Sequence, residues 1–494
     1  MTRILALDQG TTGSTALVIG ERGDIVAKAY AEFSQHFPRP GWVEHDAAEI
    51  RDVTFRVAQE VLARAGVGTP DAVGITNQRE TVVLWDRASG EPAARAIVWQ
   101  DRRTAERCRE LKEEGREPWV RERTGLVLDP YFSATKLAWM LDRDAGLRSR
   151  AEAGELAAGT IDTWLIWQLT GGEVHATDPT NASRTLLYDI HRGEWSDELL
   201  ELFGVPRAVL SDVRPSSGEF GVVSGDAPAA GARIAGVAGD QQAALFGQGC
   251  WRPGSAKSTY GTGAFLLMHT GDNAVASQRG LLSTVACGVG GEATYALEGS
   301  IFIAGAAIQW LRDELGVIAS AGETEALARS LDDNDGVYLV PAFVGLGAPH
   351  WEAEARGMVV GLTRGSRRAH LARAALEAMA YGTREVVEAM EADAGQRAPS
   401  LAVDGGATAN DWFVDFLSGM LDRPVLRPPQ IETTALGAAG LAGIGVGAWA
   451  DGDDFLAARG PFDRFEGSLD EERRELYWSG WRRAVNAAVT WARS

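Results

Sequence analysis

The first thirty residues alternate between short apolar runs and turns. Apolar runs at residues 4–7, 15–19 and 25–29 are separated by a Gly/Thr turn at 10–13 and a charged turn at 21–24. Short apolar runs bounded by glycine and other turn residues are typical of strands. The pattern therefore predicts three consecutive strands, with a glycine- and threonine-rich turn on the first hairpin.

A related pattern returns in the second half of the chain, where a turn at residues 261–263 leads into the apolar run 264–268. Helical periodicity and further short strands surround the two meanders. We predict helices at 47–65, 301–311, 367–390, 412–421 and 469–491, and strands at 72–76, 81–85, 96–99, 234–238 and 401–403. Two such halves indicate two α/β domains that face a cleft, which we assign to residues 1–248 and 249–494.

The length and composition agree with a two-domain globular protein. The chain has 494 residues, of which 45% are hydrophobic and 23% are charged, and such a length exceeds one ordinary domain. The formal net charge of −20 repels nucleic acid and anionic membranes, so we expect neither as a partner. An anionic ligand would need local positive potential.

Two further features concern the cellular compartment of the protein. Cys108, Cys250 and Cys287 are widely spaced, which argues against a disulfide framework or a zinc site. Residues 1–10 lack the basic and apolar regions of a signal peptide, so we expect a cytoplasmic protein. The longest uncharged stretch, 433–450, is rich in Gly and Ala, which indicates close helix packing and not stable membrane insertion.

The turn after the first strand has the chemistry of a phosphate site. Its glycines, including Gly13, let the backbone approach an anion, and Thr11 and Thr12 add hydroxyl and amide donors. Asp8, at the strand end, is a hard oxygen ligand suited to Mg²⁺. Taken alone, this turn is also compatible with a plain structural hairpin.

Two more glycine-rich segments strengthen the nucleotide hypothesis. The turn with Thr262 would let a nucleotide be held from both halves, and no P-loop sequence is present. Residues 403–410 read as a strand, a tight turn and a helix start, whose bare backbone at Gly406 suits a flat ring. Asn410 could then hydrogen-bond the adenosine, although a plain strand-to-helix connection would explain the segment as well.

One carboxylate near the domain boundary is a candidate catalytic base. Asp240 follows the predicted strand 234–238. A kinase acting on an alcohol needs a group that accepts the hydroxyl proton, and aspartate commonly has this role. The alternative is an aspartate that caps the following helix.

These segments, in this order, resemble the nucleotide core shared by actin, the chaperone ATPases and the sugar kinases. Residues 131–139 and 357–362 resemble the two signatures of the FGGY carbohydrate kinase family, and residues 75–81, 98–101 and 345–349 resemble its glycerol kinases. The resemblance spans nearly the whole chain. It implies an α/β protein with two ribonuclease-H-like (actin/sugar-kinase type) domains around an ATP-binding cleft.

The resemblance also implies transfer of the ATP γ-phosphoryl group to glycerol, with Mg²⁺ as cofactor between Asp8 and Asp240 and with Asp240 as base. Its implied glycerol contacts are Arg79, Glu80, Trp99, Tyr131, Asp240, Gln241 and Phe265. Its implied nucleotide contacts are Thr11, Thr12, Gly13, Thr262, Gly305, Gln309, Gly406 and Asn410. We further expect a homodimer or homotetramer.

Two local points follow from the resemblance. Neighbours on a regular strand point to opposite faces, so Arg79 and Glu80 can both reach one small ligand only from a turn or bulge. The phosphate turn of glycerol kinases usually continues to an Arg where this chain has Thr15, so one cationic phosphate contact is absent.

Two rival functions remain at this stage. The first is an FGGY kinase for another polyol or a sugar such as xylulose, although Arg79, Glu80, Trp99 and Tyr131 form a tight set for a larger substrate. The second is an ATP-gated interaction module. No peptide-binding domain follows residue 450, and the polyol residues would then have no purpose.

Overall fold

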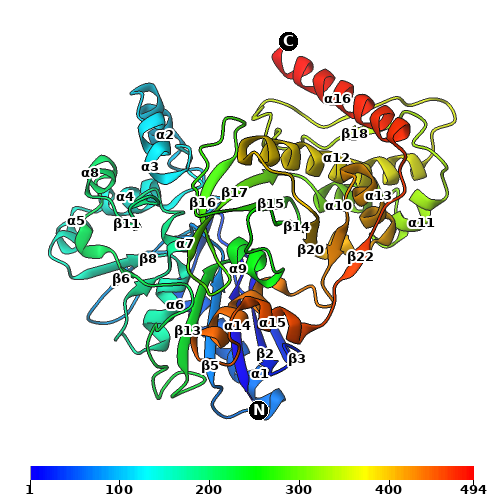
Figure 1. Cartoon of the computed structure of the whole chain (residues 1–494). Helices are drawn as coiled ribbons and strands as arrows, with labels where there is room; N and C mark the ends of the chain where they lie inside the picture. Colours follow the sequence, from blue (N-terminus) through cyan, green and yellow to red (C-terminus); the bar gives the residue numbers. More distant parts are fainter. Residues whose placement is uncertain (1) are drawn as a thin grey trace.

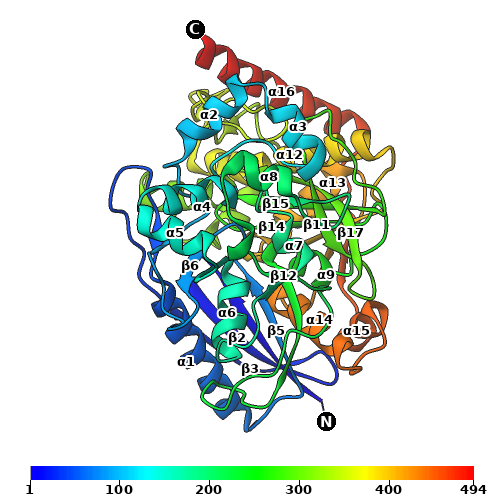
Figure 2. The same cartoon turned by 90° about the vertical axis from the view of Figure 1, so that its left-hand side faces the viewer.

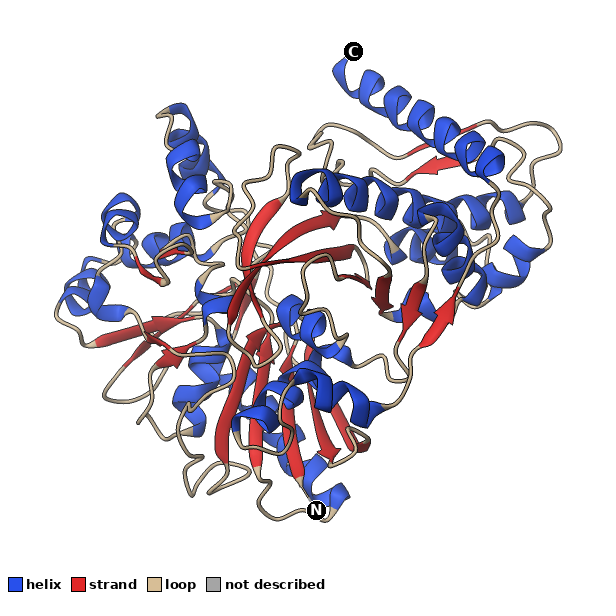
Figure 3. Cartoon of the chain, viewed as in Figure 1, coloured by secondary structure: helices blue, strands red, loops and turns tan. Residues whose placement is uncertain are grey.

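The computed structural model describes residues 2–494 and contains two large mixed sheets (Figures 1 and 3). The first sheet has five strands, in the order β13 (Arg233–Gly239), β5 (Ala72–Asn77), β1 (Arg3–Gln9), β2 (Gly13–Gly20) and β3 (Ile25–Glu32). The second has seven, in the order β16 (Leu282–Cys287), β17 (Ala293–Ile301), β15 (Ala264–Gly271), β14 (Ala256–Tyr260), β20 (Leu401–Asp404), β21 (Val425–Arg427) and β22 (Asp463–Phe465).

The two sheets share one topology. In the first, the antiparallel meander β1–β2–β3 is extended by the parallel strands β5 and β13 beside β1. In the second, the meander β14–β15–β17 is extended by β20 and β21 beside β14, again in parallel. This arrangement in duplicate is the predicted pair of ribonuclease-H-like units, so the fold prediction is confirmed.

Helices cover both faces of the first sheet. One face packs on α1 (Ala47–Ala65) and α6 (Ile161–Leu169), the other on α9 (Asp240–Gly247), α14 (Thr433–Gly445) and α15 (Gly452–Arg459). The predicted division at 248/249 places α14 and α15 with the second half, whereas they pack on the first sheet. A Cβ at Gly437 would lie 1.8 Å from the Ala243 carbonyl oxygen. The glycines of residues 433–450 therefore serve close helix packing, as predicted.

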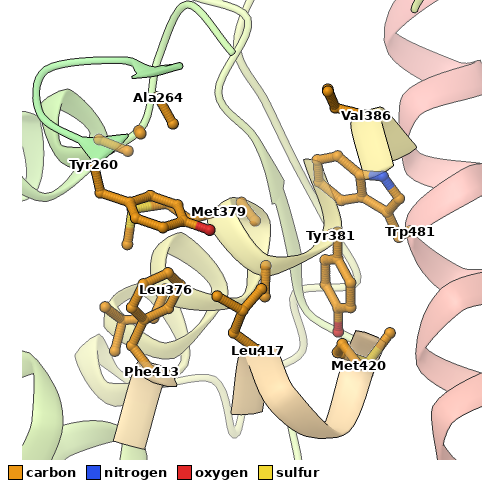
Figure 4. Close-up of a cluster of buried hydrophobic side chains, with 14 of the residues drawn as sticks. Tyr260, Ala264, Leu376, Met379, Tyr381, Val386, Phe413, Leu417, Met420 and Trp481 are labelled. Atoms are coloured by element: carbon orange, nitrogen blue, oxygen red, sulfur yellow. The ribbon is translucent and has the colours of Figure 1, made fainter. Parts of the chain in front are cut away.

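The outer face of the second sheet carries the largest core. It packs on α10 (Gly305–Asp313), α11 (Glu323–Arg329), α12 (Arg368–Ala394), α13 (Asp411–Leu421) and α16 (Glu471–Arg493). In Figure 4, Tyr260 at the end of β14 points into this core beside Phe413. Its hydroxyl lies 2.7 Å from Thr383 Oγ1 on α12. The end of β14, and with it the following turn, is thereby fixed.

The inner face of the second sheet packs on α9. Leu245 of α9 contacts Leu267 and Ala402 on this face, while Ala243 and Phe246 pack on the side of the first sheet. Helix α9 therefore lies between the two sheets, at the centre of the molecule in Figure 1.

A third group of elements builds its own small core, at the left in Figure 1 and facing the viewer in Figure 2. Its helices are α2 (Ala105–Glu113), α3 (Glu117–Thr124), α4 (Ser133–Asp142), α5 (Ala145–Glu152), α8 (Asp197–Phe203) and the 3₁₀ turn η1 (Arg207–Val209). The short helix α7 (Pro179–Ala182) packs against β13 and β16. The nearby strand pairs are β4 (Glu44–His45) with β7 (Ala96–Ile97), β6 (Val83–Asp86) with β8 (Leu156–Gly159), β9 (Ala176–Thr177) with β12 (Asp212–Val213), and β10 (Tyr188–Asp189) with β11 (Glu194–Trp195).

The remaining pair, β18 (Tyr338–Val340) with β19 (Met358–Val360), packs against α12 and α16, and the 3₁₀ turn η2 (Gly406–Ala409) follows β20. Within residues 2–494, every helix is too short or too polar to cross a bilayer.

Candidate active site between the two sheets

Three parallel strands of the first sheet end at the same edge. Gln9 of β1 and Gly239 of β13 both pair with Asn77 of β5, so Asp8, Arg79 and Asp240 gather at one place. In open α/β sheets, ligands bind outside the carboxyl ends of parallel strands. The strand register therefore builds the candidate site.

The chain reverses directly after β5. Glu80 has φ +63°, in the left-handed region that is rare for residues other than glycine, and the Thr81 N–H donates to the Arg79 carbonyl oxygen at 2.8 Å. This turn lets the side chains of Arg79 and Glu80 enter one cluster. The predicted turn is confirmed, and a strained backbone of this kind is common at functional sites.

Arg79 and Glu80 belong to a buried charge network. Arg79 Nη1 lies 2.6 Å from Glu298 Oε2, and Arg184 lies 2.7 Å from Glu80 Oε1 and 2.8 Å from Glu298 Oε1. Although burial favours the neutral acid, Arg184 and Arg79 lower the pKa of Glu298 to about 2. The network spans both sheets, because Glu298 lies on β17.

Aromatic rings form one wall of this cluster. Tyr131 Oη lies 3.5 Å from Arg79 Nη2, and the Trp99 ring packs edge-on against Tyr131 with centroids 5.6 Å apart. Trp99 Nε1 also donates to Thr11 Oγ1 at 2.9 Å. One indole thus joins the predicted polyol site directly to the predicted phosphate turn.

Asp240 is the first residue of α9 and stands between these groups. Its Oδ1 accepts the Gln241 N–H at 2.7 Å and lies 3.1 Å from Arg79 Nε. The side chain is 31% exposed, and in residues 2–494 no hydrogen bond reaches Oδ2. Asp240 thus binds the first turn of its helix through one oxygen and can offer the other to a ligand.

The second sheet presents its own row of side chains toward α9. Phe265 pairs with Thr259 and with Ser300, so it shares a sheet face with Glu298. Gln241 is 8% exposed, and its Oε1 accepts from Lys257 Nζ at 2.5 Å. Phe265 and Gln241 therefore lie next to the buried network on its second-sheet side.

The surroundings of Asp8 fit a divalent cation. Burial and the neighbouring charge of Asp240 raise the pKa of Asp8 to about 7, against the opposing effect of Lys28. Thr76 Oγ1, in register with Asp8, is buried and lacks a hydrogen-bond partner in the part of the chain that the structure describes. A bound cation would stabilise the two carboxylates in their ionised form. No cluster of three or more His, Cys, Asp or Glu side chains suited to a metal occurs within residues 2–494. A cation held by Asp8 and Asp240 would therefore have two carboxylates from the chain and keep positions for water, as Mg²⁺ sites often do.

The two Gly/Thr turns are closed by similar hydrogen bonds. Gly10 N–H donates to the Gly13 carbonyl oxygen at 3.0 Å, and Gly261 N–H to that of Gly263 at 2.9 Å. Thr12 and Thr262 are exposed at the tips. The Thr262 carbonyl oxygen accepts the N–H of Ala304 and of Ala306, which joins the second turn to α10.

Gly305 is the first residue of α10, and Gln309 is exposed one turn later. Gly406 and Asn410 lie on η2 and at its end. A Cβ at Gly406 would meet no atom within 4 Å, so this backbone is open to a ligand. The Asn410 amide caps α13 through the Phe413 N–H and donates to Thr324 Oγ1 at 3.2 Å, which leaves one amide hydrogen for a ligand.

Comparison with known proteins shows which family the chain belongs to. Residues 3–247 match the N-terminal domain, and residues 256–446 the C-terminal domain, of the FGGY family of carbohydrate kinases. The chain belongs to this family. It is 54% identical to glycerol kinase 2 of Thermotoga maritima over 99% of both chains, and 56% identical to the glycerol kinase of Deinococcus radiodurans over 99% of this chain and 98% of the relative.

Solved structures extend the comparison. Glycerol kinase of Plasmodium falciparum with ADP superposes with a TM-score of 0.93 at 35% identity, covering 99% of this chain and 98% of that chain. Xylulose kinase of Lactobacillus acidophilus superposes with a TM-score of 0.89 at 18% identity, covering 100% and 99% of the two chains. The second likeness shows the fold alone.

Sequence reasoning missed Glu298 and Arg184, which hold the buried network together. A signal was present, because each is the only charged residue in a long uncharged segment, 293–301 and 179–188 respectively. A lone charge in an otherwise uncharged segment needs a partner when it is buried. Only the fold shows that Glu298, on β17 of the second sheet, meets Arg184, in the turn after α7.

Proposed function

We propose that this chain is a glycerol kinase, which transfers the γ-phosphoryl group of ATP to a terminal hydroxyl of glycerol and gives sn-glycerol 3-phosphate and ADP. The close relatives named as glycerol kinases support the substrate. The single observation that carries the reaction is the position of Asp240, whose carboxylate lies beside Arg79 on the polyol side and adds to the field at Asp8 on the phosphate side.

The groups around Asp240 match the chemistry of glycerol. Glycerol has hydroxyls and a thin apolar edge, so it needs converging donors and acceptors together with an aromatic wall. Arg79 donates, Glu80 accepts, the Tyr131 hydroxyl can do either, and Trp99 covers the carbon chain. Because Trp99 also bonds Thr11, its indole limits the length of the space between the polyol groups and the phosphate turn, which favours a short substrate over a sugar such as xylulose.

In the proposed mechanism, Asp240 accepts the proton of the attacking hydroxyl while the oxygen bonds to phosphorus and the bond to the ADP oxygen breaks. Arg79 holds Asp240 and the substrate in line. The backbone amides of the two turns bind the phosphate oxygens, at Thr11, Thr12 and Gly13 on one side and at Thr262 on the other. Gly305, Gln309, Gly406 and Asn410 bind the rest of the nucleotide.

Asp8 and Asp240 would hold the metal ion, which we propose to be Mg²⁺. When bound, Mg²⁺ spreads the charge that develops on the transferring group. Movement of the two sheets toward each other would exclude water from the reacting atoms.

A substrate panel tests the proposal. ADP release is measured with ATP, Mg²⁺ and each of glycerol, xylulose, ribulose and gluconate, and kcat/KM is compared. We expect glycerol to exceed every other alcohol. A much higher kcat/KM with another substrate would contradict the assignment, and ATP turnover that ignores all alcohols would favour an ATP-gated interaction module.

Assembly and location remain predictions. We expect a homodimer or homotetramer, which sedimentation velocity tests, and action in the cytoplasm, where ATP is supplied. The contact between subunits would most readily involve large apolar side chains that are exposed in the single chain. Phe37 and Trp491 are examples, at 69% and 70% exposure.

A further inference from the structure

Lys28 lies on the face of the first sheet that carries Asp8. In the strand register, Asp8 pairs with Thr15 and Thr15 with Tyr30, while Leu17 pairs with Lys28. Paired residues share a sheet face, and so do residues two apart on one strand. This face therefore carries Ala6, Asp8, Thr15, Leu17, Lys28 and Tyr30, of which only Lys28 is basic.

A chain of contacts places the ammonium group of Lys28 between the two sheets. Lys28 Nζ lies 2.7 Å from Glu432 Oε1, and Glu432 immediately precedes α14. The next residue, Thr433, donates through Oγ1 to Asp404 Oδ2. Asp404 ends β20, two residues before the open backbone at Gly406. The ammonium group thus lies between the first phosphate turn and the segment proposed to bind adenosine.

Lys28 differs from the other cations of the site in being available. Arg79 is 2% exposed and is bound by Glu298 and Asp240. Lys257 is fully buried and bound by Gln241 and Thr259. The Lys28 side chain is 47% exposed, and its charge acts on Asp8. An ammonium group has three hydrogen-bond donors, so Lys28 can keep Glu432 and still bind an anion.

We propose that Lys28 binds the phosphates of the nucleotide and sets the affinity of this chain for ATP and ADP. The inference rests on the proposed ATP-dependent function of the site. It assigns a cationic phosphate contact to β3, at a position that the sequence patterns did not single out. Glu432 is a positioning residue, because it orients Lys28 toward the region between Gly406 and Thr11, where the nucleotide is proposed to bind.

Binding of ADP and of adenosine to the purified full chain, measured by titration calorimetry, tests the proposal. A charge-assisted hydrogen bond to phosphate that is partly exposed to water gives an effect of about 10-fold. We expect Lys28→Met to weaken ADP binding by that factor and to leave adenosine binding within about twofold. Lys28→Arg, which keeps the positive charge, should bind ADP about as well as the parent chain. In turnover, KM for ATP should rise while KM for glycerol stays unchanged.

Lys112→Met is the matched control, because it removes the same charge from α2, at the other end of the molecule in Figure 1, where Lys112 lies 3.2 Å from Glu117. It should leave ADP binding unchanged. The double variant Lys28→Met/Glu432→Gln separates direct contact from simple neutralisation of Glu432. We expect it to keep the defect in ADP binding.

Three results would overturn the proposal: ADP binding of Lys28→Met within twofold of the parent chain, an equal loss for adenosine, or full recovery in the double variant. Nucleotide binding needs no glycerol, so this test is independent of the substrate panel. If the parent chain fails to phosphorylate glycerol, the proposed function fails while the Lys28 result still stands.

Discussion

The two sheets have one topology but different side chains at equivalent positions. Asp8 on β1 is flanked by Thr15 and by Thr76, while its equivalent Thr259 on β14 is flanked by Phe265 and by Asp404. The central strand bears the carboxylate in the first sheet, whereas the neighbouring parallel strand bears it in the second. At equivalent positions, one fold therefore carries an aspartate, our proposed metal ligand, in the first sheet, and an aromatic ring with a buried acid in the second.

The segments that follow β5 and β20 differ in the same way. After β5 come Arg79 and Glu80, with large side chains forced inward by a strained turn. After β20 come Gly405 and Gly406, with no side chains at all. Under the proposed function, the segment after β5 would meet the alcohol with side chains, and the segment after β20 would leave its backbone open to the nucleotide.

The largest expected effect concerns Asp240, at the start of the helix between the two sheets. Asp240→Asn removes the base while keeping the shape, so kcat should fall by roughly 10²–10⁴-fold. ADP affinity should stay within about threefold, which calorimetry measures as the control. Turnover close to that of the parent chain would refute the assignment of the base.

The next effect contrasts the equivalent positions Asp8 and Thr259. Asp8→Asn removes a proposed metal ligand, so the Mg²⁺ concentration for half-maximal rate should rise by about 10-fold or more. Thr259→Val should leave that concentration unchanged, because Thr259 binds Lys257 at 2.8 Å. Equal shifts in the two variants would show that the sheets are not specialised in this way.

A separate effect is expected on stability. Glu298→Gln leaves the buried cations Arg79 and Arg184 without their shared carboxylate, so the free energy of unfolding should fall by about 3–5 kcal/mol. Denaturant unfolding measures the change, and Glu292→Gln, on an exposed loop, is the control. A change below about 1 kcal/mol would show that the network does not join the sheets.

The smallest effect separates two adjacent glycines. A Cβ at Gly405, where φ is +89°, would lie 2.2 Å from the Tyr260 carbonyl oxygen, whereas one at Gly406 would meet nothing within 4 Å. Gly405→Ala should cost about 1–3 kcal/mol of stability. Gly406→Ala should fold normally and weaken ADP binding by roughly 10-fold, because a methyl group crowds the nucleotide. Unchanged ADP binding in Gly406→Ala would argue against nucleotide contact there.

Much of the fold could be predicted because its signals are local. The first meander, both Gly/Thr turns and the long helices follow from apolar runs and periodicity, although strand β17 of the second meander was not predicted and its last residue, Ile301, was assigned to a helix. The turn at Arg79 and Glu80 follows from the need for both side chains at one ligand, which the family resemblance implied. The packing of α14 on the first sheet could not be predicted, since its partners Gly74 and Ala243 lie hundreds of residues away. The roles of Lys28 and Glu298 could not be predicted for the same reason, because their partners come from distant segments.

The central claim is most directly tested by a structure of the chain with glycerol, ADP and Mg²⁺ bound. The quantity to measure is the distance from the nearer carboxylate oxygen of Asp240 to the terminal glycerol oxygen that faces the nucleotide. Proton transfer requires that distance to be about 2.6–3.2 Å, or to be bridged by one water. A carboxylate turned away from the alcohol, with the two sheets closed around both ligands, would contradict the proposed reaction.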